Sequence, residues 1–231
     1  LCGALSGFFV AYCGVQAMGV TLGGSFLYAG FGLLVSNLSA TEAYKGISGF
    51  PESFKIISKY KLFDVIPAQL IAFAVLIVIA YILLHKSKYG RSIFLVGINQ
   101  EAAEYSGINT RLVILSTYVI SAISAALAGI MLTSYLGTAK SDLGSNLTLN
   151  IITAVVLGGT LSTGGKGSVI GTALASLVIG ILRFGLPLCF KVNTQYMDIP
   201  VGALLLIVVI GRAIVSRPET AAFFKKLKSA K

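Results

Sequence analysis

The feature that most constrains this chain is a series of apolar runs, each close to the length that crosses a lipid bilayer. A membrane-spanning helix needs about 20 predominantly apolar residues. None of the runs alternates polar and apolar residues as a transmembrane β-strand does. The sequence therefore predicts an all-α, polytopic membrane helix bundle, with about six full spans and one short span before a glycine-rich hairpin. The expected spans are 1–15, 18–37, 65–84, 112–134, 149–161 (the short one), 169–186 and 199–215.

The composition supports the bilayer as the solvent of this chain. Hydrophobic residues make up 56% and charged residues 11%, whereas a soluble domain is about 25% charged. The net charge of +10 would suggest a nucleic-acid partner in a soluble protein. Here the cations lie in short loops between apolar runs, which is the pattern of positively charged cytoplasmic loops. We therefore expect a lipid bilayer and no nucleic acid among the partners.

The charged loops predict how the chain is threaded through the membrane. The loop 85–91 carries Lys86, Lys88 and Arg91 without an acid, and the C-terminal stretch 216–231 is also basic. Both should lie in the cytoplasm, while the mixed-charge loop 38–64 should lie outside. We expect a single transmembrane domain over 1–231. Because the chain begins inside an apolar run and without Met, we also expect a fragment whose natural N-terminus is missing.

Two polar stretches have features of short helices outside the membrane. Residues 51–62 place Phe54 and Ile57 at helical spacing among lysines, which fits either an interfacial helix or a solvated loop. Residues 98–108 offer Asn99 as an N-cap and Gly107 as the residue after the last turn. The second stretch predicts a helix of about two turns on the cytoplasmic face.

The chain lacks the residues that catalysis or metal binding would need. His85 is the one histidine, and Cys2, Cys13 and Cys189 show neither C-x-x-C nor zinc spacing. By the expected threading every Asp and Glu lies in a loop or at the end of a span, which argues against an ion-coupled carrier. We therefore expect no catalytic residue, no metal and no enzymatic activity. Arg183 lies within an apolar run and could either reach toward the interface or point into a pathway.

A glycine-rich loop joins the short run to the next one. Its sequence "GGTLSTGGKGS" fails the P-loop pattern, because Lys166 is followed by Gly167 and not by Ser or Thr. The alternative is geometric, since glycines permit positive φ and close approach of backbones. We expect a tight hairpin near the cytoplasmic side whose key residues are Gly158, Gly159, Gly164, Gly165, Lys166, Gly167, Ser168 and Gly171.

Several phrases resemble the permease subunits of ribose-type, monosaccharide ABC importers, in the superfamily shared with branched-chain amino acid ABC permeases. "GINQEAAEYSGI" at 97–108 and "AVVLGGTLSTGGKGSVIGT" at 154–172 resemble two hallmarks of that family. "AYCGVQAMGVTLGGSFLYAG" at 11–30 is similar more loosely to a third segment, and "KYGRSIFLVG" at 88–97 to the stretch before the first hallmark. The resemblance covers essentially the whole chain in order.

The resemblance implies a membrane subunit that moves a monosaccharide or similar small polar solute by alternating access in the bacterial inner membrane, with a cytoplasmic C-terminus. It implies three protein partners: a cytoplasmic ABC ATPase, a second permease subunit of the same or a related kind, and an extracytoplasmic solute-binding protein. No cofactor is expected in this subunit, because ATP and Mg would be held by the ATPase. Helix 98–108 would be the coupling helix, with contact residues Gly97, Asn99, Glu101, Ala102, Ala103, Ser106, Gly107 and Ile108.

The sequence departs from the family just before the glycine loop and leaves the cargo open. Relatives commonly carry a pattern like E-L-D-A-I there, while Thr148 and Asn150 stand at the matching positions of this chain. Any role of those acids in gating or binding is therefore in doubt here, and no substrate-binding residue is assigned. The nearest alternative is a branched-chain amino acid ABC permease. An ion-coupled carrier or a membrane enzyme is disfavoured.

Overall fold

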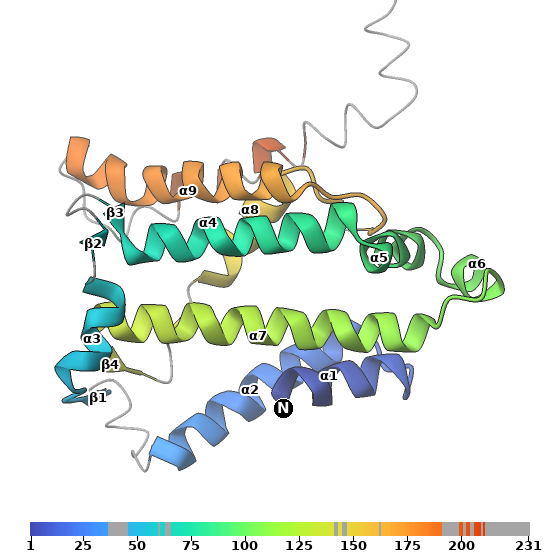
Figure 1. Cartoon of the computed structure of the whole chain (residues 1–231), viewed down its shortest axis with the longest axis horizontal. Coiled ribbons are helices and arrows are strands. Elements are labelled where there is room, and N and C mark those ends of the chain that lie inside the picture. Colours follow the sequence, from blue (N-terminus) through green and yellow to red (C-terminus); the bar gives the residue numbers. More distant parts are fainter. Residues whose placement is uncertain are drawn as a thin grey trace, which may run out of the picture. The chain divides into compact units, whose positions relative to one another are not determined.

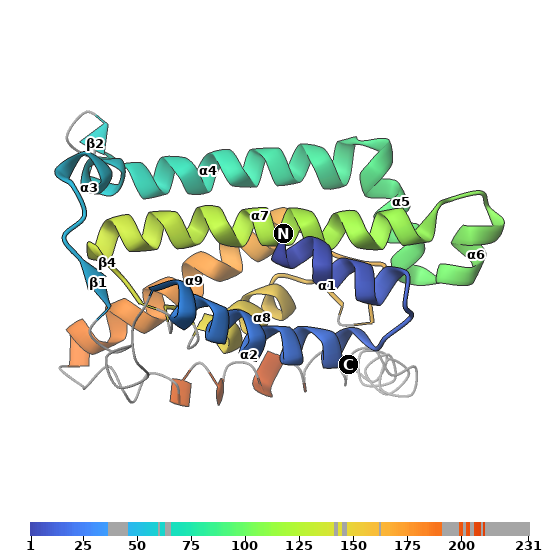
Figure 2. The same cartoon turned by 90° about the horizontal axis from the view of Figure 1, so that it is seen from below.

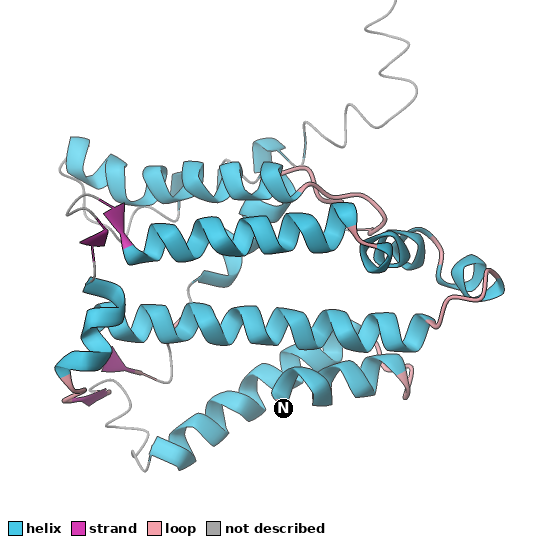
Figure 3. Cartoon of the chain, viewed as in Figure 1, coloured by secondary structure: helices cyan, strands magenta, loops and turns pink. Residues whose placement is uncertain are grey.

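The computed structural model describes a mostly helical chain that divides into two compact units, Leu1–Asn146 and Leu147–Lys231. The residues that it describes are 1–36, 46–59, 61–62, 66–140, 143–144, 147–161, 163–190, 199–200, 202–203, 206–208 and 210. Helices dominate both units, and the strands are short ribbons beside them (Figure 3).

The first unit holds most of the elements (Figure 1). Its helices are α1 (Cys2–Ala11), α2 (Ala17–Ser36), α3 (Glu52–Lys59), α4 (Ala68–Tyr81), α5 (Lys88–Ile98), α6 (Gln100–Tyr105) and α7 (Thr110–Leu136), with a π-helical turn, η1 (Ile82–Lys86), after α4. Its strands are β1 (Ile47–Ser48), paired antiparallel with β4 (Thr138–Ala139), and β2 (Lys61–Leu62), paired antiparallel with β3 (Ile66–Pro67). In the part of the chain that the structure describes, these ribbons depart from the all-α prediction.

Among the described residues, three helices are long and apolar enough to cross a membrane: Ala17–Ser36, Ala68–Lys86 and Thr110–Leu136. They correspond to the predicted spans 18–37, 65–84 and 112–134. The predicted span 1–15 is only the ten-residue helix α1, because the chain leaves the helix at Ala11 and turns at Gly14, where φ is +66°. The predicted span 199–215 falls largely outside the described residues, so the expected six full spans stay a prediction.

The core of the first unit is a close contact between α1 and α7. A Cβ atom added to Gly3 would overlap the Cβ atom of Ala122, and one added to Gly7 would lie 2.9 Å from the Cβ atom of Tyr118. Gly3 and Gly7 are four residues apart, so they share one face of α1. Small residues at this spacing let two helix backbones approach closely within a membrane, where close packing replaces the hydrophobic effect as the driving force.

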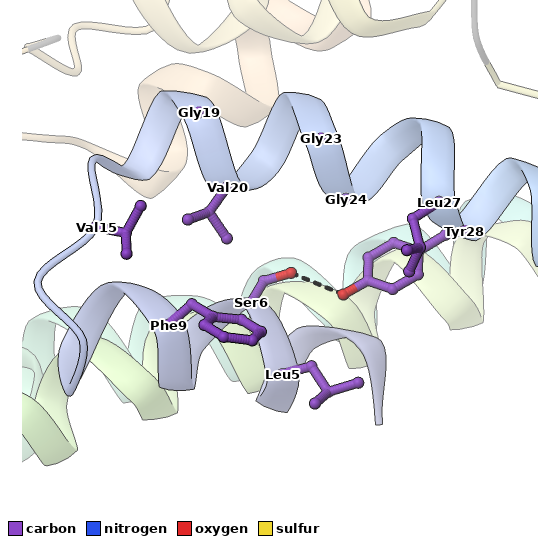
Figure 4. A pocket seen from close by; sticks show the side chains of 10 residues that line it. All are labelled: Leu5, Ser6, Phe9, Val15, Gly19, Val20, Gly23, Gly24, Leu27 and Tyr28. Atoms are coloured by element: carbon purple, nitrogen blue, oxygen red, sulfur yellow. Dashed lines mark hydrogen bonds between the residues drawn. The ribbon is translucent and has the colours of Figure 1, made fainter.

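A groove between α1 and α2 has apolar walls and a pair of hydroxyl groups (Figure 4). Its volume is about 280 Å³. The Ser6 and Tyr28 hydroxyls are 2.9 Å apart, and the Tyr28 hydroxyl donates to the Cys2 carbonyl at 2.9 Å. These bonds tie α2 to α1, since both polar groups of the pair are satisfied within the two helices.

Of the two alternatives left open for 51–62, the structure has the helix, as α3 over Glu52–Lys59, while Lys61–Leu62 form strand β2. Helix α3 packs against the end of α7. The Ser134 hydroxyl, which is 1% exposed, donates to the Phe54 carbonyl at 2.7 Å. Helix α7 then ends at Gly137, whose φ of +67° turns the chain into strand β4. Helices α4 and α7 run in opposite chain directions, with α3 and the strands at one end and α5 and α6 at the other (Figures 1 and 2).

The second unit is a helical hairpin of α8 (Thr148–Leu157) and α9 (Val169–Phe190). The ten-residue α8 confirms that the run before the glycine loop is short. The buried residues of the two helices are Thr153 and Ala154 on α8 and Ala175 and Ile179 on α9.

Candidate functional site

The predicted coupling helix is α6, and its first turn is fixed by Asn99. The Asn99 side-chain oxygen accepts a hydrogen bond of 3.0 Å from the main-chain N–H of Ala102. This bond satisfies one of the N–H groups that a helix start leaves without a main-chain partner. Glu101 lies in the first turn, where a negative charge is favourable near the positive end of the helix dipole.

The last turn of α6 closes on Gly107. The Gly107 N–H donates to the Glu104 carbonyl at 2.9 Å, and the Ile108 N–H donates to the Ala103 carbonyl at 3.1 Å. This pair of bonds is a Schellman motif, which needs a residue with positive φ after the helix. Gly107 supplies it with φ of +79°. A six-residue helix has little stability of its own, so these caps at both ends hold α6 together.

The two alanines of α6 differ in burial. Ala103 is 4% exposed and is the buried residue of the helix, which packs against α5 and the start of α7. Ala102 is exposed, as are Glu101, Glu104 and Tyr105, and Tyr105 has an exposed fraction of 93%. Ala103 therefore holds α6 against its own chain. The other five residues of the helix, with Gln100 at its start, are exposed and form the surface open to another protein.

The segment before α6 is a helix, although the sequence led us to expect a basic loop over 85–91. Helix α5 starts at Lys88, where the Ser87 hydroxyl accepts from the Gly90 N–H at 3.0 Å. Gly90 packs so closely on the carbonyl of Leu84 that a side chain would overlap it. The Tyr89 hydroxyl lies 2.5 Å from the Ser116 hydroxyl and links α5 to α7. The Ser87 cap is a local signal that the loop interpretation overlooked, whereas the contact of Tyr89 with Ser116 is a tertiary one.

The predicted helix 98–108 is shorter in the structure, and its flanking residues belong to other elements. Gly97 and Ile98 form the last turn of α5. Asn99 separates the two helices, because it ends α5 and caps α6. Ser106 is the C-cap residue of α6, and Ile108 follows the turn. The predicted contact residues are thus brought together at one helix–cap–helix junction, with Ala103 facing inward.

The glycine-rich loop of the second unit begins with the same helix ending. The Gly159 N–H donates to the Val156 carbonyl at 3.2 Å and the Thr160 N–H to the Val155 carbonyl at 3.2 Å. Gly159 has the positive φ that this motif requires, at +100°. Helix α8 therefore stops at Leu157, in agreement with the prediction that Gly158 and Gly159 end it.

The hairpin closes on a contact between two glycine backbones. A Cβ atom on Gly171 would overlap the Gly158 carbonyl, and one on Gly158 would lie 2.5 Å from the Thr172 nitrogen. Gly167 lies before α9 rather than on it, so it does not share a helix face with Gly171, and the contact of Gly171 is with Gly158. The Ser168 hydroxyl accepts from the Gly171 N–H at 3.1 Å at the start of the helix.

The turn of the hairpin is made by Gly164 and Gly165, with φ of +87° and +76°. The Leu161 N–H donates to the Lys166 carbonyl at 3.0 Å, which ties the two sides of the loop together. The Lys166 side chain is exposed. Because its backbone closes the turn and its side chain faces outward, Lys166 lacks the position of a phosphate-binding lysine within a cradle.

Arg183 lies on the packed side of α9. It is half-buried, and it follows the buried residues Ala175 and Ile179 at spacings of four residues. Residues at this spacing share a helix face. Of the two alternatives that the sequence left open, this face favours a side chain directed into the protein over one reaching along the lipid-facing side.

His85 is part of an aromatic cluster at the end of η1. Its ring stacks on Tyr81 at a centroid distance of 5.1 Å and meets the edge of Phe94 at 6.0 Å. Within the described ranges, no group of three or more His, Cys, Asp or Glu side chains could hold a metal ion. The cluster connects the membrane helix α4 with α5, which is a structural role.

Comparison with known proteins shows which protein family this sequence matches. A family model described as the permease component of the branched-chain amino acid transport system matches residues 1–209. The autoinducer 2 import system permease protein LsrD of Yersinia enterocolitica is 39% identical over 214 residues, which cover 93% of this chain. The LsrD protein of Photorhabdus temperata is 40% identical over 214 residues, with the same coverage.

The chain spans 64% of the length of these curated relatives. No solved structure matches the chain. The similarity runs through both units, because the matched region includes the α5–α6 junction as well as the glycine hairpin.

Proposed function

Because this chain belongs to the family of branched-chain amino acid transport system permease components, we propose that it is a membrane subunit of an ATP-driven importer. It translocates a small polar solute by alternating access, and it carries no catalytic residue of its own. ATP and Mg are bound by a partner ATPase. The family and the long apolar helices support an integral protein of the bacterial inner membrane, and we place its C-terminus in the cytoplasm.

The observation that carries this proposal is the construction of α6. The helix is capped at both ends and seated through Ala103, while Glu101, Ala102, Glu104 and Tyr105 remain exposed. A short element that is fixed at its base and open on its outer side can transmit a rigid push from a partner to α5 and α7. This is the arrangement that coupling to an ATPase requires.

The cargo is proposed from the relatives. The matched proteins at 39–40% identity are named as permeases of an autoinducer 2 import system, so we propose that compound or a small polar solute of similar kind. The family description names branched-chain amino acids, and a permease for these remains the alternative. A second permease subunit and an extracytoplasmic binding protein complete the proposed importer.

The glycine hairpin is the second element of the proposal. Its backbone contact between Gly158 and Gly171 and its turn at Gly164 and Gly165 make a compact corner between α8 and α9. Short helices that end in such corners line solute pathways in transporters. We therefore propose that this hairpin lies beside the translocation pathway, with Arg183 directed toward the protein interior.

The coupling role is tested by adding bulk to the outer face of α6. Ala102→Trp places a large ring on the exposed side, so the permease should still fold and insert while the ATPase no longer docks. The measurement is co-purification of the tagged permease with its ATPase from membranes, together with solute-stimulated ATP hydrolysis in proteoliposomes. We expect loss of both.

The matched control is Ser53→Trp at an exposed position of α3, which adds the same bulk to another short helix of the first unit, away from α6 (Figure 2). This control should keep the ATPase and the stimulated hydrolysis. Normal co-purification and normal stimulation in Ala102→Trp would remove the coupling assignment of α6. To test the cargo, uptake of autoinducer 2 and of leucine would be compared in the same vesicles.

A further inference from the structure

The exposed side chains of α5 form one stripe with a charged half and an apolar half. Lys88, Arg91, Leu95 and Ile98 are the exposed residues of this helix, and their spacings of three, four and three residues place them on one face. Leu95 is 49% and Ile98 68% exposed. We call these four residues the α5 stripe.

The surroundings of the α5 stripe are basic. Lys86 precedes the helix and is exposed, and neither η1 nor α5 contains an acidic residue. The nearest carboxylates in the sequence are Glu101 and Glu104, which lie on α6 beyond the Asn99 junction. Within η1 and α5, therefore, no acidic residue offsets the positive charge of the stripe.

The placement of α5 brings this stripe to the level of a membrane surface. The apolar helix Ala68–Lys86 is long enough to cross a bilayer, and α5 begins two residues after its end. Figure 1 shows α5 nearly end-on while α4 and α7 run across the view, so α5 crosses both at a steep angle. If α4 spans the bilayer, α5 lies along its surface.

We propose that the α5 stripe is a binding site for an anionic phospholipid. Lys88 and Arg91, with Lys86 beside them, contact the headgroup phosphate, and Leu95 and Ile98 lie among the upper acyl carbons. A lipid fits both halves of the stripe, because it joins an anionic group to an apolar chain. Clusters of cations next to a membrane helix attract anionic lipids in this way.

Bound lipid would also position the proposed coupling helix. Helices α5 and α6 share the junction residue Asn99 and pack on each other. Holding α5 on the headgroups therefore limits the movement of α6. Bound lipid would lower the mobility of the surface that α6 offers to the proposed ATPase. The lipid site itself does not depend on the identity of the transported solute or of the ATPase.

The direct test is native mass spectrometry of the full chain in detergent, titrated with phosphatidylglycerol or with phosphatidylcholine of the same acyl chains. The wild-type chain should bind phosphatidylglycerol more tightly. Lys88→Gln/Arg91→Gln should weaken phosphatidylglycerol binding by about 25-fold, at about fivefold for each cation near a membrane surface, and leave phosphatidylcholine binding unchanged. Added inorganic phosphate should not displace the lipid, because phosphate lacks the apolar half.

The matched control is Lys88→Arg/Arg91→Lys, which keeps both charges and should keep the preference for phosphatidylglycerol. The proposal is overturned if the neutralised variant binds phosphatidylglycerol as the wild type does. It is equally overturned if the wild type binds the two lipids alike.

A measurement on the wild-type chain alone covers the case in which the variant does not fold. Hydrogen exchange of the segment 86–98 should slow in nanodiscs that contain phosphatidylglycerol, relative to nanodiscs of phosphatidylcholine only. Equal exchange in both would contradict the proposal. Protection that appears only when the ATPase is added would assign the stripe to that protein and overturn the lipid site.

Discussion

Glycine acts in this chain as the contact point between helix backbones. Gly3 and Gly7 of α1 lie against Ala122 and Tyr118 of α7, and Gly171 of α9 lies against the Gly158 carbonyl. In a membrane there is no water to drive helices together, so the fit of small residues supplies the attraction. One added methyl group at such a point separates two backbones, whereas a glycine on an open helix face tolerates it.

The first prediction compares two glycines of α9. Gly171→Ala should destabilise the hairpin by about 1–3 kcal/mol, because the new methyl group overlaps the Gly158 carbonyl. Gly180→Ala has no atom within 4 Å of the added methyl group, so it should be neutral or stabilising by about 0.5–1 kcal/mol. Thermal unfolding in detergent measures both. Equal stability of the two variants would contradict the backbone contact.

The second prediction uses the neighbouring alanines of α6. Ala103→Leu should destabilise the first unit by about 1–3 kcal/mol, because Ala103 is 4% exposed and the space is filled. Ala102→Leu, on the exposed side, should change stability by less than about 0.5 kcal/mol. Chemical unfolding followed by circular dichroism separates the two. Similar losses in both variants would mean that Ala103 is not the seat of the helix.

At the scale of elements, the stability of α6 depends more on the capping residues at its two ends than on hydrogen bonds within the helix. It has six residues, which is too short for a stable isolated helix. The Asn99 side chain at one end and the Gly107 turn at the other supply the bonds that the short helix lacks internally. The exposed surface that we assign to coupling exists only while both caps hold.

The third prediction therefore concerns Asn99. Asn99→Ala removes the bond to the Ala102 N–H and should cost about 1 kcal/mol, which corresponds to about fivefold faster amide exchange in α6. Asn99→Asp keeps an accepting oxygen and should exchange like the wild type. Hydrogen exchange with mass spectrometry resolves the segment 99–108. Unchanged exchange in Asn99→Ala would show that packing alone holds the helix.

At the scale of the molecule, α7 separates the two ends of the first unit. It has 27 residues, a length of about 40 Å, which exceeds the hydrocarbon thickness of about 30 Å. Helices α5 and α6 lie at its N-terminal end, while α3 and the β1–β4 ribbon lie at the other (Figure 2). The two ends should therefore face opposite sides of the membrane.

The fourth prediction tests this separation by labelling with a membrane-impermeant maleimide. In a background with Cys2, Cys13 and Cys189 replaced by Ser, Gln100→Cys and Lys140→Cys should label from opposite sides. In intact cells Lys140→Cys should react and Gln100→Cys should not, because we place α6 in the cytoplasm. Inside-out vesicles should reverse the result and serve as the control. Ready labelling of Gln100→Cys in intact cells would overturn the orientation, and labelling of both from one side would contradict the span.

The features that could be read from the sequence are those set by local chemistry. The spans of α2, α4 and α7, the short α8, the Asn99 cap and the turn at Gly107 all follow from apolar length or from residues with special backbone preferences. The family was also recognisable, from the motifs at 97–108 and 154–172. Helix α5 was not predicted, because 85–91 was interpreted as a loop, so the exposure of Lys88, Arg91, Leu95 and Ile98 on one face is known only from the structure.

The sequence by itself determined that this chain is a helical membrane protein of one transport family, because hydrophobic length and glycine or asparagine preferences act within a few residues. Only the tertiary structure decided that Ala103 faces inward while Ala102 faces outward, and that Gly171 meets Gly158 while Gly180 of the same helix meets nothing. Two alanines or two glycines have the same local preferences. Their roles differ because of what a second helix brings against them, and that depends on contacts between distant parts of the chain.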